Sequence, residues 1–265
     1  MTATAPSRLR QYFDAAVRDE WDGLERINKD LRLADLFTLI NALMGLAALL
    51  ITARFGAAGV RVAIELVLAG VIMDGVDGAV ARLGKGNGPL GAVLDTLADT
   101  LTFVTTSTCV AFIAILQAYP GLAAMKMALL GIPLAFYAVC GLLRLARFES
   151  LRDDGKTRHY FSGIPTPAAA VMLLSLVLVS VSAWLLLLAA FYLGVLMVTR
   201  VRFPKLRGWL AAGSVAILLA VLLTFNNPTL QRAIAWSLLG FMALYVVLGP
   251  FYVLARYGAP LPEAR

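Results

Sequence analysis

A series of long apolar runs separated by short polar loops most constrains the fold of this chain. A helix that crosses the hydrocarbon core of a bilayer needs about 20 apolar residues, so runs of this length predict membrane-spanning helices. The runs are continuous rather than alternating, which favours helices over a membrane β-barrel. The predicted fold class is therefore all-α, a polytopic membrane helix bundle. The spans are expected near residues 35–55, 61–83, 91–117, 123–147, 166–182, 184–201, 207–225 and 233–256.

Composition supports a membrane protein of about eight spans. Hydrophobic residues make up 60% of the 265 and charged residues 15%, against about 45–50% and about 25% in soluble domains. The run from Thr166 to Thr199 is too long for one helix and contains no polar loop. A tight turn near Ser180–Trp184 is expected to divide it into two short helices.

The basic residues of the loops predict an orientation. Only four of the 23 Lys and Arg residues fall on one side of this arrangement, namely Arg54, Arg61, Lys126 and Arg232. The remaining basic residues lie on the side that holds both termini, and cytoplasmic loops are the ones enriched in Lys and Arg. Both termini are therefore expected in the cytoplasm, with the protein in the cell membrane. Basic residues scattered in this way account for the net charge of +7 and do not indicate binding to nucleic acid.

Three regions are expected along the chain. Residues 1–32 carry apolar side chains at helical spacing from Leu9 to Leu31, which predicts a cytoplasmic juxtamembrane amphipathic helix. This helix either lies on the membrane surface or packs on the rest of the protein. Residues 33–202 form the predicted membrane core, and residues 203–265 form a two-helix extension with a short tail.

Four aspartates interrupt the apolar pattern at the cytoplasmic ends of spans 2 and 3. Asp74 and Asp77 are three residues apart, and Asp95 and Asp99 are four apart, so each pair shares one helix face. Buried carboxylates in a membrane are costly and therefore indicate function. Two such faces brought together would form a cage of oxygen atoms suited to Mg²⁺ or Mn²⁺.

The whole segment reads Asp74-x2-Asp77-Gly78-x2-Ala81-Arg82-x8-Gly91-x3-Asp95-x3-Asp99. It resembles the motif of the CDP-alcohol phosphotransferase (phosphatidyltransferase) family at every defined position. Members of that family transfer a phosphoryl-linked lipid or alcohol from a CDP-linked donor to an alcohol and release CMP. The resemblance implies a divalent metal cofactor, with two ions.

The resemblance also implies roles for individual residues. All four aspartates would be metal ligands, and Asp99 would also be the catalytic base on the acceptor hydroxyl. A pocket for the CDP-lipid would contain the small and basic residues of the motif, with Lys85 from the glycine-rich turn. Asn41 in span 1 either lies near the nucleotide or makes a hydrogen bond between helices. The predicted CDP-lipid-binding residues are Gly78, Ala81, Arg82, Gly91, Asn41 and Lys85.

Three further segments resemble the membrane phosphatidylserine synthases within this family. They are residues 35–49, residues 144–148 together with 160–170, and residues 196–206. This resemblance implies CDP-diacylglycerol, or an archaeal CDP-lipid, as donor and L-serine as acceptor. Arg144 and Arg147, three residues apart at the end of span 4, are candidates to bind the acceptor, because Arg pairs well with a carboxylate. The alternative is that both are positive-inside anchors at a helix end.

One departure keeps other acceptors open. Many of these synthases continue after the last aspartate with a Ser-Phe-Gly and Ala-Pro-Ala-like stretch, where this chain has the hydroxyl-rich Thr100–Thr108. If this stretch lines the acceptor pocket, the acceptor is a different alcohol such as glycerol 3-phosphate or an inositol phosphate. Alternatively its hydroxyls bond within the bundle. From a different class, an ion-coupled transporter or an inactive relative is the other hypothesis. A homodimer is left open, since family members are often dimers.

Overall fold

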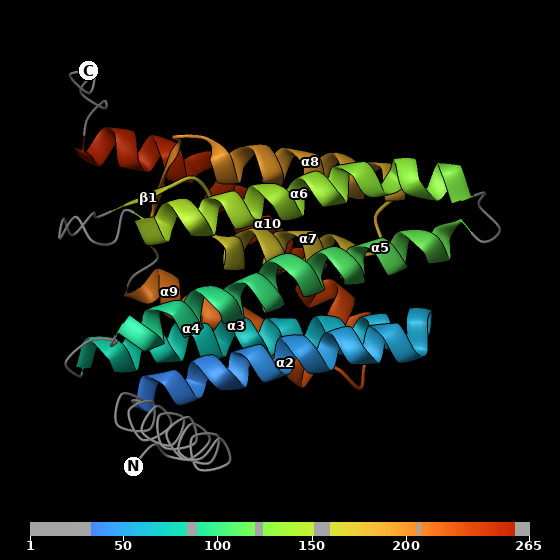
Figure 1. Ribbon diagram of the computed structural model, residues 1–265, viewed down its shortest axis with the longest axis horizontal. Coiled ribbons are helices and arrows are strands. Elements are labelled where there is room, and N and C mark those ends of the chain that lie inside the picture. Colours follow the sequence, from blue (N-terminus) through green and yellow to red (C-terminus); the bar gives the residue numbers. More distant parts are fainter. Residues whose placement is uncertain (1–32, 84–88, 120–123, 151–159, 206–207, 258–265) are drawn as a thin grey trace, which may run out of the picture.

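The computed structural model describes residues 33–83, 89–119, 124–150, 160–205 and 208–257. Helix α2 (Leu33–Phe55) and helix α3 (Val60–Leu83) are joined by the short 3₁₀ helix η1 (Gly56–Gly59). They run side by side in opposite directions (Figure 1). The other elements, in chain order, are α4 (Pro89–Asp99), the π-helix η2 (Thr100–Thr106), α5 (Ser107–Ala118), α6 (Ala124–Ser150), β1 (Tyr160–Ser162), α7 (Thr166–Leu178), α8 (Ala183–Val198), β2 (Arg202–Pro204), α9 (Trp209–Leu223) and α10 (Pro228–Tyr257).

The helices of the described residues form a bundle with roughly parallel or antiparallel axes (Figure 1). The all-α prediction is confirmed, with one short strand pair added. The predicted N-terminal amphipathic helix and the C-terminal tail lie outside the described residues.

By length and composition, the described part of the chain contains four segments able to cross a membrane. Three shorter apolar helices, α7, α8 and α9, accompany them. The sequence predicts about eight spans; the lower number arises because the segment Leu33–Ala81 includes both α2 and α3, and because the three short helices fall below about 20 residues. The outer faces of the bundle carry exposed Leu and Phe side chains, as expected for contact with lipid. The four segments are Leu33–Ala81, Leu90–Ala118, Met127–Ser150 and Pro228–Arg256.

The break predicted near Ser180–Trp184 is confirmed. Helix α7 ends at Leu178 and α8 begins at Ala183. Between them Ser180 adopts a positive φ of 57°, and the Ser182 hydroxyl accepts a hydrogen bond from the Leu185 amide at 3.4 Å. A left-handed residue followed by a serine N-cap reverses the chain in a few residues.

The strand pair was not expected from the sequence. β1 precedes α7 and β2 follows α8, and they pair antiparallel with Phe161 opposite Phe203. Phe203 is fully buried and its ring lies 5.7 Å from that of Tyr245 on α10. The Tyr245 hydroxyl donates to the Pro204 carbonyl at 3.1 Å. The pair therefore joins the start of α7 and the end of α8 to the middle of α10.

The helix formed by α4, η2 and α5 changes register just after Asp99. Seven residues of η2 are π-helical, a form that often occurs at functional sites. The Thr106 hydroxyl donates to the Leu101 carbonyl, five residues earlier, at 2.8 Å, and contacts the Gly45 carbonyl at 3.1 Å. The Thr102 hydroxyl donates to the Asn41 carbonyl at 3.0 Å. For Thr102 and Thr106 the structure thus shows the second of the two alternatives for this stretch, hydrogen bonding within the bundle.

We expect Gly45→Ala to destabilise the protein. A Cβ at Gly45 would overlap the Thr102 side chain and lie 2.9 Å from its Cα, and overpacking of this kind costs about 1–3 kcal/mol. The matched control is Gly240→Ala on α10, where an added Cβ meets nothing within 4 Å. Thermal unfolding in detergent should show a lower midpoint for the Gly45 variant only; equal midpoints would contradict the close α2–η2 contact.

Candidate active site

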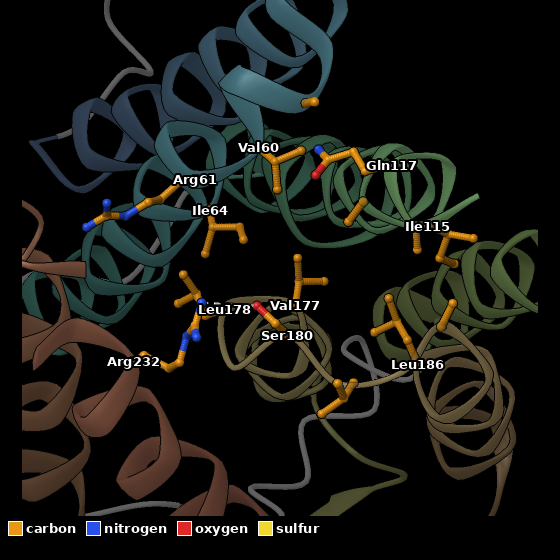
Figure 2. Close-up of a pocket in the computed structure, with 15 residues that line it drawn as sticks. Val60, Arg61, Ile64, Ile115, Gln117, Val177, Leu178, Ser180, Leu186 and Arg232 are labelled. Atoms are coloured by element: carbon orange, nitrogen blue, oxygen red, sulfur yellow. Dashed lines mark hydrogen bonds between the residues drawn. The ribbon is translucent and has the colours of Figure 1, made fainter. Parts of the chain in front are cut away.

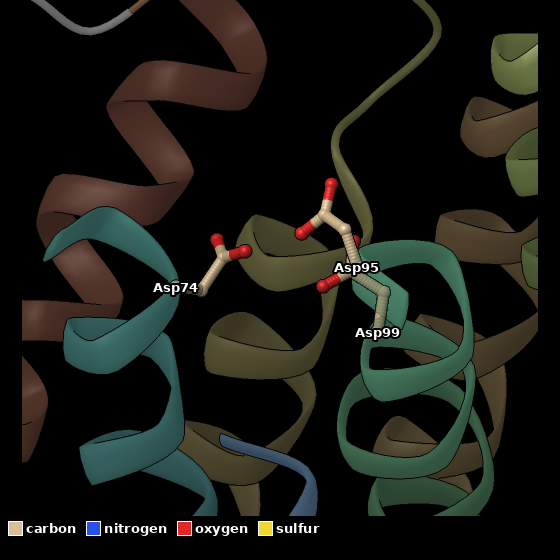
Figure 3. Close-up of side chains that lie close together, drawn as sticks. All are labelled: Asp74, Asp95 and Asp99. Carbon is tan, nitrogen blue, oxygen red and sulfur yellow. The ribbon is translucent and has the colours of Figure 1, made fainter. Parts of the chain in front are cut away.

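Three of the four motif aspartates converge at one end of the bundle. Asp74 projects from α3 toward Asp95 and Asp99 on α4 (Figure 3). One carboxylate oxygen of each residue lies within 4.8 Å of the corresponding oxygens of the other two. The i,i+4 spacing places Asp95 and Asp99 on the same face of α4, as the sequence predicts.

The donor set suits a hard divalent cation. Three carboxylates offer oxygen ligands from two helices, which is the ligand type that Mg²⁺ and Mn²⁺ prefer. Oδ1 of Asp99 is buried and has no hydrogen-bond partner among the described residues. A buried carboxylate oxygen without a partner is unfavourable, so a cation at this position would satisfy it.

Asp77, the fourth motif aspartate, is not among the three with converging oxygens, but it lies within electrostatic range of Asp74, Asp95 and Asp99. Its side chain is buried, and Oδ2 accepts a hydrogen bond of 2.8 Å from the hydroxyl of Thr38 on α2. Asp35, also buried on α2, lies close enough to interact with it electrostatically. Thr38 and Asp35 were not singled out from the sequence, because nothing in an apolar span marks which polar side chain faces a neighbouring helix.

Arg144 reaches the aspartate cluster from α6. It is buried, its Nη1 donates to the Thr166 hydroxyl at 3.1 Å, and it lies within electrostatic range of Asp99 and Asp74. Its Nε has no hydrogen-bond partner among the described residues. A buried guanidinium beside carboxylates, with a donor still available, is arranged to bind an anionic group.

Arg147 makes different contacts. Its Nη1 donates to the Val198 carbonyl at 3.1 Å, and its Nη2 donates to the Ser162 carbonyl, also at 3.1 Å. A longer contact of 3.4 Å reaches the Ser162 hydroxyl. Arg147 therefore links β1 to the end of α8, while Arg144 faces the carboxylates.

Asn41 is fully buried on α2, and neither its side-chain oxygen nor its nitrogen has a partner among the described residues. A Cβ at Gly70 of α3 would lie 2.7 Å from Oδ1 of Asn41, so a larger residue there would displace the Asn41 side chain. A hydrogen bond between helices does occur at Asn41, but its backbone carbonyl accepts it from the Thr102 hydroxyl. The Asn41 side chain takes no part in it.

The remaining predicted pocket residues occupy the ends of α3 and α4. Gly78 and Ala81 lie on the last turns of α3, and Gly91 is buried near the start of α4. For Arg82 the structure describes the backbone within α3, and Lys85 lies outside the described residues.

An apolar helix bundle with carboxylates converging at one end defines a membrane-helix protein with a candidate divalent-cation site. More specifically, the chain belongs to the CDP-alcohol phosphatidyltransferase family, which it matches over residues 31–196. This match confirms the resemblance seen in the motif. The matched residues include the four motif aspartates, Arg144 and Arg147.

Similar proteins named CDP-diacylglycerol–serine O-phosphatidyltransferase occur in several organisms. The relative from Mycobacterium leprae is 30% identical over 207 residues, 73% of this chain and 61% of that protein. The relative from Mycobacterium tuberculosis is 36% identical over 121 residues, 44% of this chain and 39% of that protein. The aligned chain thus spans less than two thirds of these mycobacterial relatives. The relative from Helicobacter pylori is 29% identical over 225 residues, 81% of this chain and 88% of that protein.

Proposed function

We propose that this protein acts in phospholipid biosynthesis as a CDP-diacylglycerol–serine O-phosphatidyltransferase. It transfers the phosphatidyl group of CDP-diacylglycerol, or of an archaeal CDP-lipid, to the hydroxyl of L-serine and releases CMP. The observation that carries the proposal is the convergence of Asp74, Asp95 and Asp99, with Arg144 beside them. The family match and the printed names of the relatives support the same reaction.

The aspartates would hold Mg²⁺ or Mn²⁺, with two ions. Asp74, Asp95 and Asp99 supply the converging oxygens, and Asp77 completes the proposed ligand set from the same turn of α3. Bound metal would neutralise the pyrophosphate of the donor and stabilise the leaving CMP.

The side chains of the protein would bind both substrates, and one of them would deprotonate the serine hydroxyl. Asp99 accepts the proton of the serine hydroxyl, whose oxygen forms the new bond to phosphorus as the bond to CMP breaks. CMP departs with the electron pair of that bond. Gly78, Ala81 and Gly91 leave space for the nucleotide close to backbone. The unpartnered amide of Asn41, with Arg82 and Lys85, is assigned to the CDP-lipid.

Arg144 is the residue we assign to the serine carboxylate. Its position beside Asp99 and its available Nε would place the carboxylate near the base. Arg147 was an equal candidate on sequence. Its three contacts to β1 and α8 favour a supporting role in which it shapes the acceptor side of the site.

The hydroxyl-rich stretch after Asp99 bears on the choice of acceptor. Thr102 and Thr106 donate to carbonyls of α2 and of their own helix. Their hydroxyls are thus occupied in helix packing, which weakens the argument that this stretch selects an acceptor other than serine.

We also propose that the protein spans the cell membrane eight times, with both termini and the aspartates on the cytoplasmic side. The eight spans would be α2, α3, the continuous α4–η2–α5 helix, and α6 to α10. Helix direction places Arg54, Arg61 and Arg232 at the end of the bundle opposite the aspartates. This distribution agrees with the positive-inside rule.

The acceptor is tested by incubating purified protein in lipid with CDP-diacylglycerol, Mg²⁺ or Mn²⁺ and a panel of labelled alcohols. We expect a lipid product with L-serine and not with glycerol 3-phosphate or inositol phosphate. Product with another alcohol alone would overturn serine and leave the chemistry intact. Absence of product with every alcohol would favour a transporter or an inactive relative.

Replacement of Arg144 with Gln is expected to raise KM for serine by about tenfold to a hundredfold, the value of a charge-assisted hydrogen bond of about 1.5–3 kcal/mol. Arg147→Gln is the matched comparison. It should lower the thermal midpoint and change KM less, because its partners are backbone carbonyls. Equal KM values for serine in the wild type and Arg144→Gln would contradict serine binding by Arg144 and favour the alternative, a positive-inside anchor at the helix end.

A further inference from the structure

A cavity lies at the end of the bundle opposite the aspartates. Its volume is about 470 Å³, within the range of about 300–1,000 Å³ usual for ligand pockets. The start of α3, the end of α5, the α7–α8 turn and α10 surround it (Figure 2). Arg61 lines the cavity and precedes Asp74 by 13 residues of α3, about 20 Å along the helix at 1.5 Å per residue. The cavity is therefore separate from the candidate active site.

The walls of this cavity combine apolar side chains with cationic and polar ones. The polar residues that line it are Arg61, Arg232, Gln117 and Ser180, and the described lining contains no acidic side chain. The apolar wall includes Ile64, Ile115 and Leu186 (Figure 2). A cavity lined by apolar side chains and two arginines is complementary to an amphipathic anion.

The two arginines differ in how firmly they are held. Arg61 donates through Nε to Oε1 of Gln231 at 2.7 Å, contacts the Phe225 carbonyl, and stacks on the Phe225 ring. Gln231 in turn contacts Glu65, so Arg61 belongs to a packed polar cluster behind the cavity wall. Arg232 is exposed and reaches from α10 toward Ser180, with a contact of 3.5 Å between Nη2 and Oγ (Figure 2). Its guanidinium therefore keeps donors for a ligand.

We propose that this cavity binds the phosphate headgroup of a phospholipid from the leaflet opposite the aspartates. Arg232 and Ser180 hold the phosphate, with Arg61 adding positive charge, because guanidinium groups match phosphate oxygens in a bidentate arrangement. The glycerol and upper acyl chain lie on the apolar wall. Exposed residues at the mouth, including Ala57 and Ala118, leave the rest of the chains in the bilayer.

Binding is tested by native mass spectrometry of the detergent-solubilised protein titrated with dioleoylphosphatidylglycerol. We expect one lipid adduct that weakens about tenfold in Arg232→Gln, as loss of a charged hydrogen bond predicts, and also weakens in Ala118→Trp, which fills the cavity. The matched control is Arg54→Gln, because Arg54 lies at the same end of the bundle but outside the cavity lining. The aspartate site is unaltered in all these variants, so a difference among them reports on the cavity.

Two probes distinguish a lipid from its parts. Dioleoylglycerol, which lacks the phosphate, should give no comparable adduct, and inorganic phosphate should not displace the phospholipid. The proposal is overturned if dioleoylglycerol binds equally well, if inorganic phosphate displaces the lipid, or if Arg232→Gln and Ala118→Trp bind the lipid as the wild type does.

Discussion

Asp99→Asn is expected to abolish phosphatidyl transfer, with a fall in kcat of at least about a hundredfold and up to about ten-thousandfold, the range for loss of a positioned base. Asn keeps the size of the side chain but cannot accept the proton of the serine hydroxyl. It also replaces one of the three converging carboxylates with a neutral amide, which is a weaker ligand for a divalent cation. Both effects act on kcat, which is measured from CMP release at saturating serine and CDP-diacylglycerol.

The control for this variant is Glu149→Gln. Glu149 lies on α6 at the same end of the bundle, where it accepts a hydrogen bond from Thr96 at 3.4 Å, and it is outside the carboxylate cluster. The activity of the Glu149→Gln variant should stay within about threefold of wild type, because substitutions away from such sites change the free energy by about 0.5 kcal/mol or less. Asp99→Asn should also retain the thermal midpoint of a folded protein. Substantial turnover in a folded Asp99→Asn protein would remove the base assignment.

Removal of divalent metal with EDTA is expected to eliminate activity, and addition of Mg²⁺ or Mn²⁺ should restore it. Three carboxylates within 4.8 Å of one another repel unless a cation or protons neutralise them. Metal should therefore stabilise the fold as well, by about 2.7 kcal/mol at a concentration of about 100 times Kd. Thermal unfolding with and without metal measures this without reference to turnover.

Asp74→Asn provides the matching test of the ligands. With one carboxylate neutralised, the variant should show a smaller metal-dependent rise in midpoint, and the metal-free variant should be at least as stable as the metal-free wild type. Full activity of the wild type in EDTA, or an equal metal-dependent rise in both proteins, would contradict a metal site at Asp74, Asp95 and Asp99.

The site was predictable where a motif marks it. Helix periodicity places Asp95 and Asp99 on one face of α4, and the motif predicted that this face meets the one that carries Asp74 and Asp77. That Asp74, and not Asp77, joins the converging oxygens depends on how α3 packs against α4. The different contacts of Arg144 and Arg147 were not predictable. Both lie at the end of α6, and only the location of Thr166 and of the β1 backbone determines which guanidinium faces the carboxylates.

In the fold too, the features set by local sequence were predictable and those set by long-range contacts were not. Apolar runs predicted the helices and the turn at Ser180, since both depend on local sequence. The pairing of β1 with β2 joins residues about 40 positions apart over three residues each, too short for a pattern of alternation. The cavity near Arg232 draws residues from several helices, and no segment of the sequence marks it.

The π-helix η2 has a consequence for how this chain tolerates change in length. Each residue of an α-helix turns the chain by about 100°, so the wider turn after Asp99 rotates everything beyond it relative to the aspartates. The same continuous helix thus aims carboxylates at the site and, past Thr106, buries Val110 and Ile115 against other helices. If one residue between Thr100 and Thr106 were deleted, the helix could no longer direct the aspartates into the site and bury Val110 and Ile115 at the same time. The number of residues in this stretch is therefore a requirement independent of their identity.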